Sequence, residues 1–301
     1  MQRSVLRVHA ALGTVALLFS INYVVAKIAL REIDPLAFAW LRVVGAAALL
    51  HALARSRRSP LSARLTRSDL RKLVGYTFLG VVFNQLLFIN GLARTSAHEA
   101  AILITTIPIF TLIGAFALRL EKASLAKAAG IAIAASGALL IIGLEGAAQR
   151  QGRLTGDILI LLNCISYGTY LVVSRPLVMR LSPARVIRII FTLGIPLMLP
   201  FSIHSLLAQD WSSVHASSWA ALAVVVAGPT VGAYLLNAWA LARIESSVVA
   251  AYTYLQPVFA SILAFLVLGE RLSLVTAAGA LLIIAGVWLA SGKRNPSRSV
   301  L

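Results

Sequence analysis

The sequence predicts an all-α integral membrane protein whose ten transmembrane helices form two inverted five-helix repeats, with both termini cytoplasmic. Three observations lead to this fold class: the composition, the placement of basic residues and an internal repeat. The 301 residues are 59% hydrophobic and 12% charged, with a mean hydropathy of +0.89, whereas a soluble domain carries about 25% charged residues. So few charges cannot cover a water-facing surface, which excludes a soluble globular enzyme.

Apolar runs of about 20 residues, the length that a helix needs to cross a bilayer, recur along the chain. The first run continues past Ser20 without a signal-peptide cleavage site, so we expect a retained first helix. Most connections are short, and the one long polar stretch covers residues 55–72. The predicted spans are 8–30, 35–54, 73–93, 99–118, 125–144, 155–174, 187–208, 217–240, 247–268 and 274–291.

The basic residues are distributed unevenly between alternate connections. With a cytoplasmic N-terminus, 20 of the 27 lysines and arginines fall on the cytoplasmic side and five on the other, while Lys27 and Arg42 lie inside spans. This bias follows the positive-inside rule and predicts a multi-pass protein with both termini in the cytoplasm and an even number of spans. The basic residues of 55–72 are then a topology signal beside anionic lipid, and nucleic acid is not an expected partner.

A shift of 149 residues aligns the second half of the chain with the first. Between Ala101 and Leu140, 14 of 40 positions are identical without a gap. Hydrophobic composition alone does not align proline, glutamate and glycine, so the repeat indicates a duplication. Five spans per copy is an odd number, so the second copy enters the membrane from the opposite side, as in alternating-access transporters. The aligned pairs include Pro108 with Pro257, Glu121 with Glu270, Gly130 with Gly279, and Gly137 with Gly286.

The repeated motif resembles the drug/metabolite transporter superfamily, in particular its EamA-type ten-helix exporters. The likeness lies in Pro108 followed by Leu120-Glu121-Lys122, Pro257 followed by Gly269-Glu270-Arg271, Ser20-Ile21-Asn22-Tyr23 with Lys27, and Asp34-Pro35 with Leu41-Arg42. Leu120 departs from the usual glycine before the glutamate, and Phe19-Ser20 replaces the usual aromatic-Gly pair.

The resemblance covers roughly residues 10–291 and assigns one EamA-type repeat to residues 1–146 and a second, inverted one to residues 147–301. It implies export of amino acids, including aromatic and hydrophobic ones, or of related small metabolites across the bacterial inner membrane. The path it implies is a central cavity lined by both halves.

Polar side chains inside the spans mark faces that avoid lipid. Amides and phenols at helical spacing can bond a carboxylate or an amine and still present apolar surface, which suits an amphipathic ligand. The alternative for each residue is a hydrogen bond that holds two helices together. The candidate substrate-pathway residues are Asn22, Tyr23, Tyr76, Asn84, Thr106, Asn163, Tyr167, Tyr170, Tyr234, Asn237, Tyr252 and Gln256.

A second group has candidate gating or structural roles: Lys27, Arg42, Pro108, Pro257, Glu121 and Glu270. Lys27 lies near the outer end of its span, from which its ammonium reaches water. Arg42 lies about 10 Å deep; it pairs with Asp34 or Glu99, or it binds a substrate carboxylate, and we favour the structural pair. The prolines are expected to bend their helices, and the four aligned glycines to allow close helix packing.

The remaining features narrow the function class. The single cysteine, Cys164, permits no intramolecular disulfide or cysteine metal cluster, and neither a metal nor a cofactor is expected. No acidic residue or histidine lies at mid-span, which favours facilitative transport or unconventional coupling. The sequence contains neither a zinc-protease motif nor a Walker A motif, so it indicates neither a membrane enzyme of that kind nor an ATP-driven pump. We therefore expect a monomeric carrier of a small molecule; the alternatives are a nucleotide-sugar or phosphometabolite carrier, a passive channel and a polytopic membrane enzyme.

Overall fold

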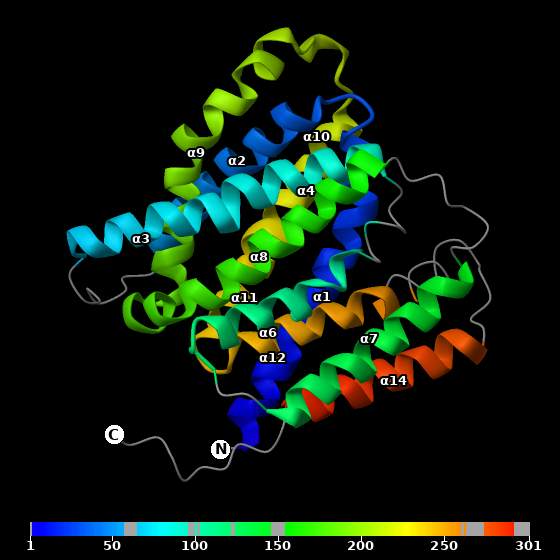
Figure 1. Cartoon of the computed structure of the whole chain (residues 1–301). Helices are drawn as coiled ribbons and strands as arrows, with labels where there is room; N and C mark the ends of the chain where they lie inside the picture. Colours follow the sequence, from blue (N-terminus) through cyan, green and yellow to red (C-terminus); the bar gives the residue numbers. More distant parts are fainter. Residues whose placement is uncertain are drawn as a thin grey trace.

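The computed structural model describes residues 2–56, 65–95, 100, 103–121, 124–145, 154–259, 262 and 274–291, and every regular element within these ranges is helical (Figure 1). The elements are α1 (Gln2–Ala29), α2 (Pro35–Ser56), α3 (Arg67–Thr77), η1 (Phe78–Val82), α4 (Phe83–Arg94), α6 (Ile107–Ala117), α7 (Leu125–Glu145), α8 (Leu154–Leu181), α9 (Pro183–Ala208), η2 (Trp211–Ser213), α10 (Ala216–Val225), η3 (Val226–Gly232), α11 (Ala233–Leu241), α12 (Ser246–Ala251), η4 (Tyr252–Tyr254) and α14 (Leu274–Ser291).

Six helical stretches among the described residues are long and apolar enough to cross a membrane: Leu6–Ala29, Pro35–Arg55, Arg67–Arg94, Leu154–Leu181, Pro183–Ala208 and Ala216–Leu241. They match the predicted first, second, third, sixth, seventh and eighth spans. Shorter apolar helices occur at the predicted fourth, fifth and tenth spans. The predicted ninth span, 247–268, lies partly outside the described residues. The described residues are thus all-helical and contain six helices that can span a membrane, as the predicted fold class requires, while the total of ten spans and the cytoplasmic termini stay predictions.

Several helices, including α3 and α8, extend beyond the apolar runs from which their spans were predicted. α3 begins at Arg67, before the expected residue 73, because Thr66 and Asp69 form a capping box around its first turn. α8 continues to Leu181, past the expected residue 174, through Pro176. Arg180, at the end of α8, forms an ion pair with Asp69. Hydropathy detects only the part of a helix that lies in hydrocarbon, so capped polar turns at the ends escape it.

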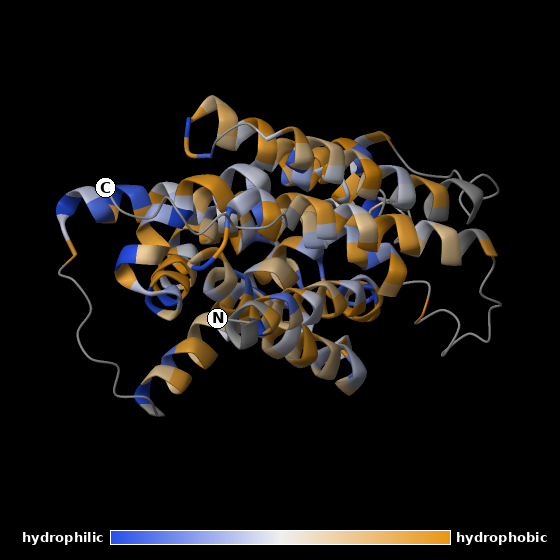
Figure 2. Ribbon diagram, turned by 90° about the horizontal axis from the view of Figure 1, so that it is seen from below, coloured by the Kyte–Doolittle hydropathy of each residue, from blue (hydrophilic) through white to orange (hydrophobic). Residues whose placement is uncertain are grey.

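Helices from the two halves of the chain pack on one another and share one hydrophobic core. α4 and α6 both pack along α8, α2 lies along α9, and α1 contacts α10 and α11 (Figure 1). Large apolar side chains also lie on the outside, including Leu125, Leu207 and Trp288. Figure 2 shows hydrophobic residues on most helices and hydrophilic residues gathered at several helix ends. Such an apolar exterior suits contact with lipid.

Interruptions of the α-helical pattern recur at the 149-residue offset. The π-helical segment η1, shifted by 149 residues, falls inside the π-helical segment η3. A turn at Thr105 and Thr106 precedes Pro108 in the first turn of α6, and the 3₁₀ segment η4 precedes Pro257. The two prolines therefore follow breaks in their helices. π-Helical turns and broken membrane helices are frequent at functional sites.

The helices α7 and α14 cross with almost no space between their backbones. A Cβ added to Gly130 would lie 2.7 Å from the carbonyl oxygen of Gly286, and one added to Gly137 would lie 2.6 Å from that of Gly279. The prediction that these glycines allow close packing is confirmed. Because the order of contacts reverses along the two helices, α7 and α14 run antiparallel.

Candidate substrate cavity

A cavity lies among helices from both halves of the chain, and its empty space, including the solvent at its opening, is about 490 Å³. Its lining residues come from α1, α2, α4, α6, α8, α11 and η4, and from two short helical segments beside the helix breaks, residues 103–104 and 255–259. They are Phe19, Asn22, Tyr23, Arg42, Asn84, Gln85, Phe88, Ile104, Ile107, Asn163, Tyr167, Tyr234, Thr253 and Gln256. Seven candidate pathway residues are among them: Asn22, Tyr23, Asn84, Asn163, Tyr167, Tyr234 and Gln256.

The polar lining residues are connected by hydrogen bonds between helices. The Tyr23 hydroxyl donates to Gln256 Oε1 at 2.6 Å, and the Tyr234 hydroxyl lies 2.8 Å from Asn84 Oδ1. Asn163 Nδ2 donates to the backbone oxygen of Asn84 at 2.8 Å. The same side chains therefore line the cavity and hold helices together, so the two roles considered from the sequence occur in the same residues.

Some equivalent positions of the two halves, related by the 149-residue offset, either contact each other or both line the cavity. Gln85 Nε2 lies 3.4 Å from the hydroxyl of Tyr234, its counterpart in the second half. Ile104 and its counterpart Thr253 both line the cavity, as do Ile107 and its counterpart Gln256. The two members of each of these two pairs differ in polarity: isoleucine in the first half, a hydrogen-bonding side chain in the second. The lining is thus chemically asymmetric although its positions repeat.

Arg42 also lines the cavity and is only 3% exposed. Its Nε donates to Thr230 Oγ1 at 2.5 Å, and it forms no ion pair with any described residue. The expected pair with Asp34 is not formed, because the Asp34 carboxylate accepts the backbone N–H of Leu36 at 2.8 Å at the start of α2. The other expected partner, Glu99, lies outside the described residues.

A second, smaller cavity, with about 270 Å³ of empty space including open solvent, shares Phe19, Tyr167, Thr253 and Gln256 with the first. The candidate residues Asn237 and Tyr252 line this second cavity. Asn237 Nδ2 donates to the Tyr167 hydroxyl at 2.6 Å, and Tyr252 forms a hydrogen bond with His9 of α1. The smaller cavity therefore continues the larger one past the side chains that they share.

The other candidate residues line neither cavity. Tyr76 is buried in α3, and Tyr170 lies against Gly80 of η1 and stacks on Tyr167. Thr106 bonds the backbone oxygen of Leu103 beside the helix break. Lys27 Nζ donates to the backbone oxygen of Thr95 at 3.0 Å. Glu270 lies outside the described residues.

Several lining residues were not among the candidates. Phe88 follows Asn84 by four residues and Phe19 precedes Tyr23 by four, so helical spacing from a correct candidate could have identified these two. Gln85 is the counterpart of the candidate Tyr234 at the 149-residue offset, so the internal repeat could have identified it. Ile104 and Ile107 carry no polar signal. Apolar cavity walls cannot be distinguished from apolar core in a sequence, so only the structure reveals them.

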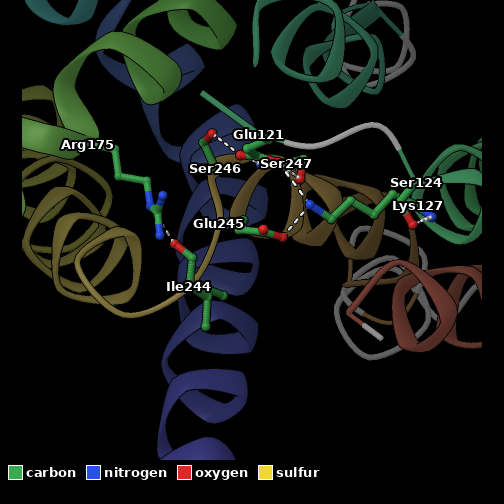
Figure 3. Close-up of polar contacts among 8 residues, drawn as sticks. All are labelled: Glu121, Ser124, Lys127, Arg175, Ile244, Glu245, Ser246 and Ser247. Carbon is green, nitrogen blue, oxygen red and sulfur yellow. Dashed lines mark hydrogen bonds and ion pairs between the residues drawn. The ribbon is translucent and has the colours of Figure 1, made fainter. Parts of the chain in front are cut away.

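Glu121 is at the centre of a polar cluster beyond the end of α6 (Figure 3). Its carboxylate accepts hydrogen bonds from Ser246 Oγ at 2.5 Å, from Ser247 N at 3.1 Å and from the Ser247 hydroxyl. Lys127 Nζ lies 3.1 Å from Glu121 Oε2 and also pairs with Glu245. Because Ser246 and Ser247 begin α12, the carboxylate of one half caps a helix of the other.

The pKa of Glu121 reflects this cluster. Burial by itself would raise the pKa, but the hydrogen bonds from Ser246 and Ser247 and the charge of Lys127 together hold it below its usual value. Nearby, Arg175 Nε donates to the backbone oxygens of Leu241 and Ile244, so the connection into α12 is held from a second side (Figure 3).

A second carboxylate, Glu32, connects the α1–α2 turn to the start of α10. It accepts hydrogen bonds from Ser218 Oγ at 2.7 Å and from His215 N at 3.0 Å, and its other oxygen lies 2.7 Å from His215 Nδ1. The Ser218 bond, followed by the His215 backbone bond, lowers the pKa of Glu32 below its usual 4.5. This contact and the Glu121 cluster tie the two halves together at two places.

The lowered pKa of Glu32 predicts a pH-dependent contribution to stability. A carboxyl whose pKa is lower in the folded state stabilises it above the unfolded-state pKa and loses that contribution as the pH falls through the folded-state pKa. We expect Glu32→Gln to lower the thermal unfolding midpoint in detergent at neutral pH. The difference from the wild type should shrink below pH 4.5. A difference that stays constant down to strongly acidic pH would contradict this assignment.

Comparison with known proteins finds similar proteins along almost the whole chain. The model of the EamA-like transporter family matches residues 8–143 and again residues 154–292. An uncharacterized transporter of Archaeoglobus fulgidus is 28% identical over 291 residues, which are 96% of this chain and 99% of the relative. A probable terminal-alkyne amino-acid exporter of Streptantibioticus cattleyicolor is 27% identical over 231 residues, 76% of each chain. A solved crystal structure superposes with a TM-score of 0.74 at 19% identity over 97% of this chain and 99% of its own, which indicates a shared fold.

Proposed function

The chain belongs to the EamA-like transporter family, and we propose that it exports small metabolites, foremost amino acids with aromatic or hydrophobic side chains, across the inner membrane. It is a multi-pass membrane protein of a transporter family, and the relatives from Archaeoglobus fulgidus and Streptantibioticus cattleyicolor are named as a transporter and an exporter. The observation that carries the substrate proposal is the cavity, in which amides and phenols alternate with Phe19, Phe88 and Ile107. Such a lining suits a ligand with one polar end and one apolar end.

The proposed mechanism is alternating access by two inverted five-helix repeats, residues 1–146 and 147–301, in a ten-helix bundle. Three observations support it: the family model matches once in each half, π-helical segments recur at the 149-residue offset, and α7 runs antiparallel to α14. Related helices that run in opposite directions are expected when the second repeat is inverted. In this mechanism the breaks before Pro108 and Pro257 absorb the rocking of the repeats.

The proposed orientation places both termini in the cytoplasm. Contacts between the segments that connect the predicted spans are consistent with this orientation, since each contact joins two segments that are assigned to the same side of the membrane. Glu121 meets Ser246 and Arg180 meets Asp69 on the predicted cytoplasmic side, and Glu32 meets His215 on the other. Inner-membrane location and action as a monomer are part of the same proposal.

A phosphorylated substrate fits the cavity less well than an amino acid. A nucleotide sugar or phosphometabolite carries at least two negative charges, and Arg42 is the one charged side chain among the described lining residues. A passive channel would share the lining but would not show counterflow. These two alternatives are therefore separated from the proposal by substrate competition and by transport kinetics.

Transport assays on cavity variants test the proposal. Purified protein in liposomes is expected to catalyse saturable counterflow of L-phenylalanine or L-leucine. Asn84→Ala and Tyr23→Ala should lower this flux about tenfold or more, because each loses a lining group and an interhelical hydrogen bond. Asn163→Ala and Asn237→Ala should lower it as well.

Asn90→Ala is the matched control for Asn84→Ala. It removes the same side chain from the same helix, but Asn90 lines neither cavity and bonds the backbone of its own helix at Leu86. Its counterflow should equal that of the wild type. Wild-type liposomes that give no counterflow with any amino acid would refute the proposed substrate class. Normal flux in all four cavity variants would refute the proposed site.

A further inference from the structure

The cavity contains a buried cation with an unused hydrogen-bond donor. Arg42 Nη1 is inaccessible to solvent and has no hydrogen-bond partner among the described residues. A buried charge is normally paired and hydrogen-bonded, because loss of water is otherwise uncompensated. The donor belongs to a residue that lines the cavity, so a ligand in the cavity is positioned to supply the missing acceptor.

The remainder of the Arg42 side chain is held in place. Its Nε donates to Thr230 Oγ1 at 2.5 Å, and the same Thr230 hydroxyl bonds the backbone oxygen of Val225 at 2.7 Å across the π-helical segment η3. One edge of the guanidinium is therefore anchored to an interrupted helix. A planar, anchored guanidinium is well suited to bind a carboxylate.

A matching acceptor lies on the same cavity. Asn22 Oδ1 is buried and has no hydrogen-bond partner among the described residues, and Asn22 lines the cavity with Arg42. The neighbouring polar groups are already bonded to each other, as in Tyr23 to Gln256 and Tyr234 to Asn84. Among the described lining residues, Arg42 Nη1 and Asn22 Oδ1 are the two fully buried side-chain atoms without a hydrogen-bond partner.

We propose that Arg42 and Asn22 form a two-point subsite, in which the guanidinium binds a substrate carboxylate and the Asn22 amide oxygen accepts a hydrogen bond from the adjacent ammonium. This inference rests on the proposed function and assigns the polar end of the substrate to named atoms. The apolar end of the substrate then contacts Phe88, Ile104 and Ile107. Arg42 thereby acts in specificity rather than in a structural ion pair.

Competition in the wild-type protein tests the subsite without any mutation. Counterflow of L-phenylalanine is measured with L-phenylalaninamide and 3-phenylpropionate as competitors. The amide lacks the carboxylate, and 3-phenylpropionate lacks the ammonium. Each should compete about tenfold or more weakly than L-phenylalanine, because a site built to bond a group rejects an analogue that lacks it.

Two variants assign the two contacts. Arg42→Gln should bring L-phenylalanine and its amide within about twofold of each other, while Asn22→Ala should do so for L-phenylalanine and 3-phenylpropionate. Arg94→Gln, on an exposed arginine bonded to Asn90, should keep the wild-type ranking. If Arg42→Gln fails to fold, Thr230→Val tests the anchor, and it should weaken L-phenylalanine competition more than amide competition.

The outcomes separate this inference from the proposed function. Counterflow of L-phenylalanine with equal competition by its amide would overturn the subsite and leave the proposed function intact. So would a preference for the carboxylate that persists in Arg42→Gln. Absence of counterflow with every amino acid would instead overturn the proposed function, and with it the inference that depends on it.

Discussion

Replacing Gly286 by alanine is expected to destabilise the protein strongly, and replacing it by leucine to prevent α7 and α14 from packing. A Cβ at position 286 would lie 2.4 Å from the backbone nitrogen of Ala134 and 2.6 Å from the backbone oxygen of Gly130. Both neighbours are main-chain atoms, so no side-chain rotation relieves the overlap. The cost should reach about 3 kcal/mol, at the top of the range for overpacking.

Thermal unfolding in detergent, together with size-exclusion chromatography, measures this effect. Gly13→Ala is the control, because a Cβ at Gly13 meets nothing within 4 Å. It should leave the unfolding midpoint unchanged or raise it slightly, since alanine favours a helix. Gly130→Ala should reproduce the Gly286→Ala result, because its Cβ would lie 2.5 Å from the backbone nitrogen of Ala290. Equal stability of Gly286→Ala and the wild type would show that the helices are not this close.

Glu121→Gln is expected to loosen the contact between the end of α6 and the start of α12. The amide has the shape of the carboxylate, but it loses the charge that pairs with Lys127, and one of its two acceptors becomes a donor facing a serine hydroxyl. We expect a loss of about 1.5–3 kcal/mol in the free energy of unfolding, typical of hydrogen bonds to a charged group. The wild-type advantage should also diminish in acid, because the lowered pKa of Glu121 means that its contribution is lost as the pH falls through the folded-state pKa.

Glu245→Gln is the matched control for Glu121→Gln. Glu245 pairs with the same lysine, but its side chain is 43% exposed, and exposed ion pairs contribute about 0–1 kcal/mol. Unfolding midpoints of both variants, measured between neutral and acidic pH, distinguish a buried cap from a surface pair. Equal and small effects of the two substitutions would contradict the capping role of Glu121.

Features that depend on local composition were accessible from the sequence. Low charge and repeated apolar runs indicate a membrane protein, and both can be evaluated from the sequence because each residue adds to the hydropathy and the charge of its segment whatever the tertiary fold. The ends of α3 and α8 were missed, since the cap formed by Thr66 and Asp69 lies outside the apolar run. Recurrence of Gly130 and Gly137 at Gly279 and Gly286 indicated close packing, because glycine permits contact between helix backbones.

The cavity was predictable only in part. Polar lining residues such as Asn84 and Tyr234 stood out against an apolar background, whereas Ile104 and Ile107 look like any other buried isoleucine. Of the two acidic partners predicted for Arg42, Asp34 does not pair with it and instead bonds the first turn of its own helix, at Leu36, while Glu99 lies outside the described residues.

By itself, the sequence determined that the chain lies in the membrane, that its two halves are related, and that glycine positions pack closely. These properties follow from the hydropathy and charge summed along the chain and from the recurrence of residues at the 149-residue offset. Only the tertiary structure decided which groups meet: Glu121 with the start of α12, Gln85 with Tyr234, and Arg42 with Thr230 beside Asn22 on one cavity. Such contacts join residues far apart in the chain, and they depend on how whole helices are oriented, which no local pattern encodes.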